Sequence, residues 1–196
     1  MKKILLLLFL SFFINLYAQA ENIEDFEIEG ISLGDSALEF FTEAQIKKNT
    51  RNYYKSKTYV PVQNDQMSFF ETYYAVDFSF KRNDDEYKIV DLSGIIDYRN
   101  KDMNQCYKEM DEIALKFDSL FTNIKRKYPK KTYKHPNKKK NKSGKSTFTE
   151  IRYVFKNGDN ALITCYDYSV EHGSMDHLNI SINKKKFVSW LQNKAY

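Results

Sequence analysis

The sequence lacks the short motifs that mark the commonest catalytic sites. It contains no Gly-x-Ser-x-Gly, no His-Glu-x-x-His, no glycine-rich phosphate loop and no Cys-x-x-Cys. Histidine is scarce, with 3 residues in the whole chain. The adjacent carboxylates Asp84 and Asp85 stand in a polar reversal, where contact with solvent explains them. We therefore expect no catalytic residue and no cofactor, and we predict that the protein is not an enzyme.

Beyond its first residues, the chain also lacks an apolar run long enough to cross a membrane. Residues 1–20 begin with a positive segment, continue with an apolar run and end in Ala18-Gln19-Ala20, a small-x-small cleavage signal. This order is typical of a secretory signal peptide. No cysteine stands at the cleavage point, where Glu21 would begin the mature chain, which argues against a lipid-anchored protein. We predict cleavage near Ala20 and a periplasmic or extracellular location.

Cysteine is nearly absent, and the two that occur are Cys106 and Cys165. In an oxidising compartment, a small even number of cysteines favours one structural disulfide. The alternative is a pair of buried free thiols. If the bond forms, it would stabilise the fold by roughly 3–4 kcal/mol, through its constraint on the unfolded chain.

Residues 102–127 predict a long amphipathic helix, because apolar residues recur there at steps of three and four. Asn100 or Asp102 can cap its N-terminus. The apolar stripe consists of Met103, Cys106, Met110, Ile113, Phe117, Leu120 and Ile124. Cys106 therefore faces whatever sheet the helix covers. Shorter helical patterns follow Ser36 and cover residues 184–194.

Alternating apolar residues predict strands in both halves of the chain. These strands cover residues 58–62, 68–81, 87–98 and 148–156, and two more lie around Ile163 and Ile180. Pro61 confines the first strand to an edge of its sheet, since proline cannot donate to a second neighbour. Asn157-Gly158 predicts a tight hairpin turn after the fourth strand.

Runs of strands between helices predict an α+β fold with an antiparallel sheet. The simplest organisation is two halves, residues 31–98 and 102–183, each a helix followed by a meander of three strands. The long helix then packs on the sheet. Residues 21–196 are expected to form a single domain that ends in the helix of residues 184–194.

The segment from residue 125 to 146 is strongly cationic, since half of it is Lys or Arg and none of it is acidic. The whole chain has 31 basic and 26 acidic residues, so the rest of the protein is net acidic. We predict a flexible basic loop over residues 128–147 that contacts an anionic membrane surface or an acidic protein. Nucleic acid is not expected for an exported chain. The alternative is a solvated hairpin extension without a partner. The candidate contact residues are Lys130, Lys131, Lys134, Lys138, Lys139, Lys140, Lys142 and Lys145.

Residues 167–177 gather side chains that can bind a divalent metal. The weak candidates are Glu171, His172, Asp176 and His177. Their spacing matches no standard metal site, and turns are rich in such residues for conformational reasons. No metal is therefore predicted.

The opening of the mature chain carries two resemblances. Ile31-x-Leu33-Gly34-x-Ser36, followed by a helix and strands, resembles the small helix-plus-meander lipoproteins that assist outer-membrane barrel assembly. That likeness covers residues 31–98 and implies a role through protein contact. The longer opening DFEIEGISLGDSALEFF is similar to that of uncharacterised secreted bacterial proteins.

Together, these sequence features predict an exported, non-catalytic protein that binds a protein or an envelope surface. A second hypothesis comes from the many aromatic residues that alternate along the predicted strands, which could form a groove for a small ligand as well as fill a core. A hydrolase with a site invisible to motif inspection is the third. The sequence leaves the oligomeric state open.

Overall fold

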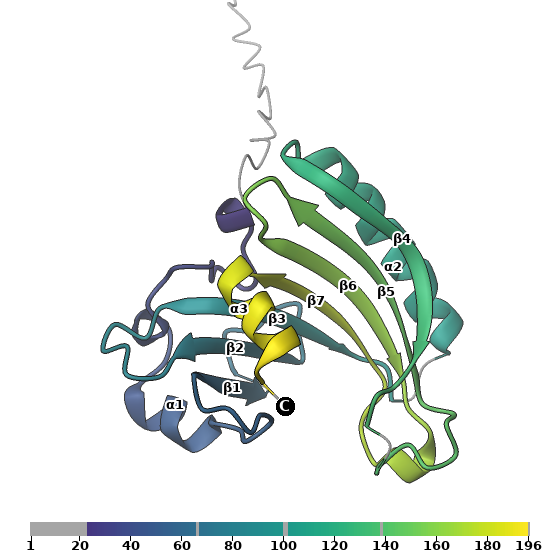
Figure 1. Ribbon diagram of the computed structural model, residues 1–196, viewed down its shortest axis with the longest axis horizontal. Helices are drawn as coiled ribbons and strands as arrows, with labels where there is room; N and C mark the ends of the chain where they lie inside the picture. Colours follow the sequence, from purple (N-terminus) through teal and green to yellow (C-terminus); the bar gives the residue numbers. More distant parts are fainter. Residues whose placement is uncertain (1–22, 66, 100–101, 138, 196) are drawn as a thin grey trace, which may run out of the picture.

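The protein forms one seven-stranded antiparallel sheet with helices on both faces (Figure 1). The computed structural model describes residues 23–65, 67–99, 102–137 and 139–195. The expected signal peptide, residues 1–20, and Lys138 lie outside the described residues. The helices are α1 (Glu43–Asn49), α2 (Met103–Leu120) and α3 (Lys185–Asn193). The strands are β1 (Tyr59–Asp65), β2 (Ala75–Lys81), β3 (Ile89–Asp97), β4 (Ile124–Lys134), β5 (Thr147–Phe155), β6 (Asn160–Asp167) and β7 (His177–Asn183).

The strand order is β1-β2-β3-β7-β6-β5-β4, so two meanders meet in the middle of the sheet. The first meander is β1 to β3 and the second is β4 to β7. They join through the antiparallel pairing of β3 with β7, from Asp91 opposite Asn183 to Asp97 opposite His177. The predicted α+β class and antiparallel sheet are confirmed. The second meander has four strands instead of the expected three, because residues 124–134 form β4.

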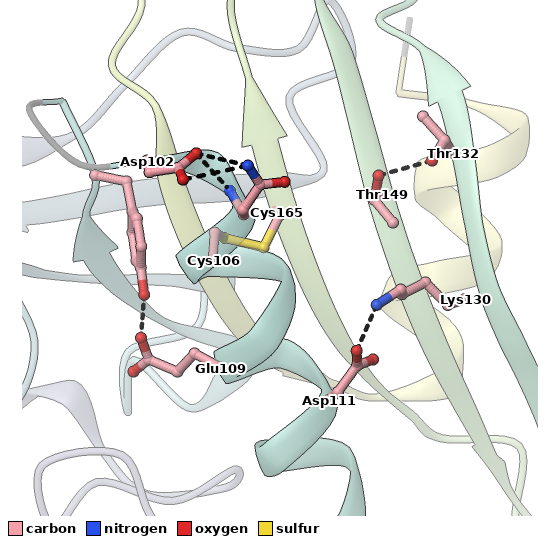
Figure 2. The surroundings of a disulfide bond; sticks show 10 residues. Asp102, Cys106, Glu109, Asp111, Lys130, Thr132, Thr149 and Cys165 are labelled. Atoms are coloured by element: carbon pink, nitrogen blue, oxygen red, sulfur yellow. Dashed lines mark hydrogen bonds and ion pairs between the residues drawn. A yellow bond between two sulfur atoms is a disulfide. The ribbon is translucent and has the colours of Figure 1, made fainter.

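Helix α2 covers one face of the sheet, mainly at β6. It begins as predicted, because the Asp102 side chain accepts a hydrogen bond from the Asn104 amide at 3.0 Å. Cys106, Met110 and Phe117 are buried on its inner face. The Cys106–Cys165 disulfide ties its first turn to β6, as Figure 2 shows, which confirms the predicted bond.

The predicted extent of this helix is wrong at its C-terminal end. Helix α2 stops at Leu120, and Ile124 opens β4 opposite Phe155 on β5. The apolar period continued to Ile124 because that side chain packs against the same core from a strand. Sheet pairing thus overrides the helical pattern over residues 121–127.

The strand predicted over residues 68–81 is also too long, since β2 begins at Ala75. The Glu29 carboxylate accepts hydrogen bonds from the backbone amides of Glu71, Thr72 and Tyr73, at 3.0, 2.7 and 2.9 Å. These amides therefore donate to a side chain and not to a neighbouring strand, and residues 71–73 stay outside the hydrogen-bonded sheet.

The helix predicted after Ser36 is split into two short pieces. Ser36 caps a single 3₁₀ turn, Ala37–Glu39, by accepting from the Leu38 amide at 3.3 Å. Helix α1 starts later, at a capping box in which Thr42 and Gln45 bond reciprocally.

The main core lies between one face of the sheet and α2 with the N-terminal segment. Ile28 and Ile31 are fully buried there, beside Ile163 and Cys165 of β6. Helix α3 lies against the opposite face, where Trp190 packs edge-on against Tyr54 and Tyr59 at 4.9 Å between ring centres. Figure 1 shows α3 in front of the curved sheet and α2 behind it.

Candidate functional site

The face of the sheet that α2 leaves uncovered forms a hollow of about 330 Å³ beside α3, lined by both apolar and polar residues. Both meanders contribute to its floor, and Phe187, Val188 and Leu191 of α3 form one side. Its carboxyl, hydroxyl and amide groups include those of Asp77, Asp91, Glu150, Ser79, Ser93, Ser181, Asn160, Asn179 and Asn183. A concave site with several convergent polar groups is the usual form of a ligand site.

Two rows of paired residues build this floor, since directly opposite residues in an antiparallel sheet point to the same face. One row runs across five strands through Asp77, Ser93, Ser181, Leu162 and Arg152. The neighbouring row runs across four strands through Ser79, Asp91, Asn183 and Asn160. The register therefore places acidic groups over β2 and β3, and the basic group over β5.

The acidic wall consists of Asp77 and Asp91. Asp77 Oδ2 accepts a hydrogen bond from Gln63 Nε2 at 3.3 Å, while its Oδ1 is enclosed without a hydrogen-bond partner. Asp91 Oδ2 accepts from the Ser79 hydroxyl at 2.8 Å. Among the ion pairs of the described residues, none includes either carboxyl group.

Burial raises the pKa of both groups well above that of an ordinary carboxyl. The pKa of Asp77 rises to about 8, first through desolvation and then through the charges of Asp91 and Asp65. Desolvation raises the pKa of Asp91 to about 7, against the opposing effect of the Ser79 hydrogen bond. Near neutral pH, this wall therefore holds protons that solvent-exposed aspartates would have lost.

The opposite wall holds Arg152. Its Nη2 pairs with Glu150 Oε1 at 2.7 Å, and its Nε is enclosed without a hydrogen-bond partner. The hollow thus has two enclosed polar atoms without hydrogen-bond partners, Asp77 Oδ1 and Arg152 Nε, on two different walls. Buried polar atoms normally find partners, so these two atoms mark positions where a ligand could bond.

Aromatic residues form part of the lining of this hollow. Tyr53, Tyr54 and Tyr166 line it together with Phe187, but hydroxyl, amide and carboxyl groups make up much of the rest. Asp77, Asp91 and Arg152 were not selected from the sequence. The sequence feature that could have identified them is an ionisable residue within an otherwise apolar strand, as in the run Val76-Asp77-Phe78.

The cationic segment is built differently from the predicted loop over residues 128–147. Residues 128–134 belong to β4, which pairs with β5 and forms an edge of the sheet. A register shift between Tyr128 and Lys131 accommodates Pro129 there. Both faces of β4 are largely exposed, so its sequence has no apolar alternation from which a strand could be recognised.

The candidate lysines of this segment differ in their surroundings. Lys130 reaches across to α2 and pairs with Asp111 at 2.6 Å (Figure 2), and Lys131 lies over the Tyr133 ring at 5.1 Å. A second group is exposed on the turn between β4 and β5, and within the described residues it makes no ion pair. It comprises Lys139, Lys140, Lys142 and Lys145, which we call the basic tip. Lys134 ends β4 beside this turn.

The basic tip has a defined conformation, which the sequence did not predict. Asn141 is buried, and its amide donates to the carbonyls of His135 and Ser146 at 3.2 and 3.0 Å. The Ser146 amide donates back to Asn141 Oδ1 at 2.9 Å. Glu171 accepts from the Ser143 amide at 2.7 Å and so joins the tip to the turn before β7.

The weak metal candidates have separate structural roles. Glu171 binds Ser143, and Asp176 Oδ1 accepts from the Tyr168 amide at 2.6 Å. His172 stacks on Tyr168 at 4.3 Å between ring centres, and His177 stacks on Tyr166 at 4.6 Å. In the part of the chain that the structure describes, no three His, Cys, Asp or Glu residues are grouped to hold a metal ion.

Comparison of the chain with protein-family models, curated proteins and solved structures gives no match. Across the described ranges, no helix combines the length and the apolar composition needed to cross a membrane.

Proposed function

We propose that this chain is an exported, non-catalytic binding protein that holds a small polar ligand in the hollow. The observation that carries the proposal is the pair of enclosed polar atoms without partners, Asp77 Oδ1 and Arg152 Nε, on two walls of one cavity. Leaving such atoms unbonded costs free energy, which a ligand that hydrogen-bonds to both atoms would recover.

The test is a thermal-shift screen of residues 21–196 against amino acids, aliphatic amines, sugars and nucleosides. A compound present at a hundred times its Kd would stabilise the folded protein by about 2.7 kcal/mol. Ser181 lies in the middle of the floor, so Ser181→Phe would fill the hollow and abolish the shift.

Ser119→Phe is the matched control, because Ser119 is exposed on α2 away from the hollow. Binding that survives in Ser181→Phe would place the ligand elsewhere and remove the proposal. Product formation from a bound compound would instead make the protein an enzyme.

The Cys106–Cys165 disulfide supports the proposal that the protein is exported, because such bonds persist in oxidising compartments. We expect the protein recovered from the periplasm or the medium to begin at Glu21, as N-terminal sequencing would determine. Recovery of the uncleaved chain from the cytoplasm would contradict it.

A second candidate function is attachment to an anionic membrane surface through the basic tip. Four exposed lysines without ion-pair partners in the described chain favour it. Each lysine near an anionic surface contributes about 1 kcal/mol at moderate ionic strength. The likeness of residues 31–98 to assembly lipoproteins agrees with a role at the envelope.

Sedimentation with vesicles that contain an anionic phospholipid tests this second function. Replacing all four lysines of the basic tip with Gln would reduce binding, while the same change at exposed Lys47, Lys48, Lys55 and Lys57 would not. Equal loss in both variants would indicate a general charge effect. Salt-insensitive binding would rule out the electrostatic mechanism.

A further inference from the structure

We infer that the ligand of the hollow carries an aliphatic ammonium group, which binds between Asp77 and Asp91. This inference rests on the proposed function and adds the chemical class of the ligand. It follows from three features of the acidic wall, namely the placement of its carboxyl groups, the charges around them and the aromatic rings beside them.

The two carboxyl groups are close enough to share one ammonium. Asp77 lies opposite Ser93, and Asp91 lies opposite Ser79, so the two aspartates are diagonal neighbours on adjacent strands. Such diagonal neighbours are about 7 Å apart, which leaves room for one nitrogen between the two carboxyl groups. Three N–H donors of an ammonium could serve Asp77 Oδ1, which has no partner, and the remaining oxygens.

Neither carboxyl group of the acidic wall has an ion-pair partner among the described residues. The charged groups around Asp77 are Asp91 and Asp65, which are acidic, and Arg51, which is basic. Arg51 Nε reaches the Gln63 side chain at 3.5 Å and makes no ion pair with either carboxyl group in the described structure. Gln63 therefore separates the arginine from the carboxyl that it would neutralise.

Among the described residues that line the hollow, the one cation is Arg152, which lies on the opposite wall and pairs with Glu150. Helix α3 lines the hollow with Phe187, Val188, Leu191 and Gln192, and the nearest strand of the second meander adds Ser181. A neutral pair of carboxyl groups is tolerated in such surroundings, but an ionised pair is costly. An incoming ammonium supplies the missing positive charge.

Aromatic rings stand at the same site. Tyr53 and Tyr54 line the hollow and belong to the segment before β1. Asp77 lies on β2, the strand that pairs with β1. The faces of such rings attract organic cations by about 0.5–2 kcal/mol. Carboxyl groups combined with tyrosine rings favour an amine over a neutral polyol or an anion.

The inference predicts a proton balance that a neutral ligand would not produce. At neutral pH the carboxyl groups hold protons, and an ammonium binds their ionised forms. Binding must therefore release protons to the buffer, up to about one for each carboxyl that ionises. The affinity should rise with pH between 6 and 8.

Isothermal titration calorimetry on residues 21–196 tests this directly. The probes are 1,5-diaminopentane and spermidine, and 1,5-pentanediol is the neutral analogue. We expect the amines to bind and the diol not to bind. The measured enthalpy in phosphate and Tris buffers should differ by the heat of the protons released.

Asp77→Asn and Asp91→Asn preserve shape and remove the charge. Each should weaken amine binding at least tenfold, whereas Asp85→Asn, in an exposed turn, should leave it unchanged. The proton release of the unaltered protein provides an independent measurement if a variant folds poorly.

Two negative results are distinguishable. If no amine binds but a neutral or anionic compound does, and Ser181→Phe abolishes that binding, the amine inference is wrong and the hollow is still a ligand site. If nothing binds in the hollow, the proposed function fails as well. Amine binding without proton release would overturn the assignment to Asp77 and Asp91.

Discussion

The two aspartates of the hollow, Asp77 and Asp91, owe their raised pKa values to burial in the folded sheet. Asp77 and Asp91 lie in strands that pack a core on their other face, so their desolvation follows from the same folding that buries Phe78 and Leu92. The free-energy cost is limited because both carboxyl groups are able to hold protons. We expect this to be visible in the pH dependence of folding.

The free energy of unfolding should decrease as pH rises from about 5 to about 8. An acid whose pKa is raised by folding binds its proton more tightly in the folded state, so stability is highest below the ordinary pKa of 3.8 and is lost as pH passes through about 7 and 8. The slope is about 1.4 kcal/mol per pH unit for each proton involved.

Urea denaturation at several pH values measures this slope. The double variant Asp77→Asn/Asp91→Asn should have a flatter profile and be more stable than the natural chain at pH 8. A double variant with the same slope as the natural chain would show that other groups control the titration.

At the scale of elements, sequence patterns identified strands and helices wherever one face is buried. The stripe of α2 and the apolar alternation of β5, β6 and β7 were recognised for this reason. Strand β4 was missed because both its faces meet solvent, and the first part of the predicted second strand was misjudged because a distant carboxylate binds its amides.

Glu29 therefore determines where β2 begins, and its replacement tests that conclusion. Glu29→Gln leaves one acceptor oxygen for three amides and should lower the free energy of unfolding by about 1–3 kcal/mol. Hydrogen exchange at Glu71, Thr72 and Tyr73 should accelerate. Glu27→Gln, at an exposed position, is the control, and unchanged exchange in Glu29→Gln would contradict the assignment.

The candidate site was less predictable than the fold. The sequence shows that one side of each strand is polar, but not that α3 stands beside that side and encloses it. The partner of each polar residue depends on the β3–β7 pairing, which joins distant parts of the chain. Asp77 and Arg152 therefore could not be assigned to one cavity before the strand order was known.

At the scale of the whole molecule, the disulfide links the two layers of the main core. It closes a loop between residues 59 positions apart, and Cys106 and Cys165 are both fully buried. The double variant Cys106→Ala/Cys165→Ala should lose about 2–4 kcal/mol of unfolding free energy.

Thermal denaturation of the two proteins under oxidising conditions measures that loss. Under strongly reducing conditions that open the bond, the difference between them should shrink, since neither chain would then carry the cross-link. A persistent difference would point to packing of the sulfur atoms as the source.

The position of β7 has a consequence for the timing of assembly. It is the last strand to be synthesised, yet it occupies the centre of the sheet between β3 and β6. The two meanders cannot join until β7 has been synthesised, and pairings between distant segments form slowly. A chain without β7 would therefore have one unpaired edge on β3 and another on β6, and such edges are prone to pair with other chains.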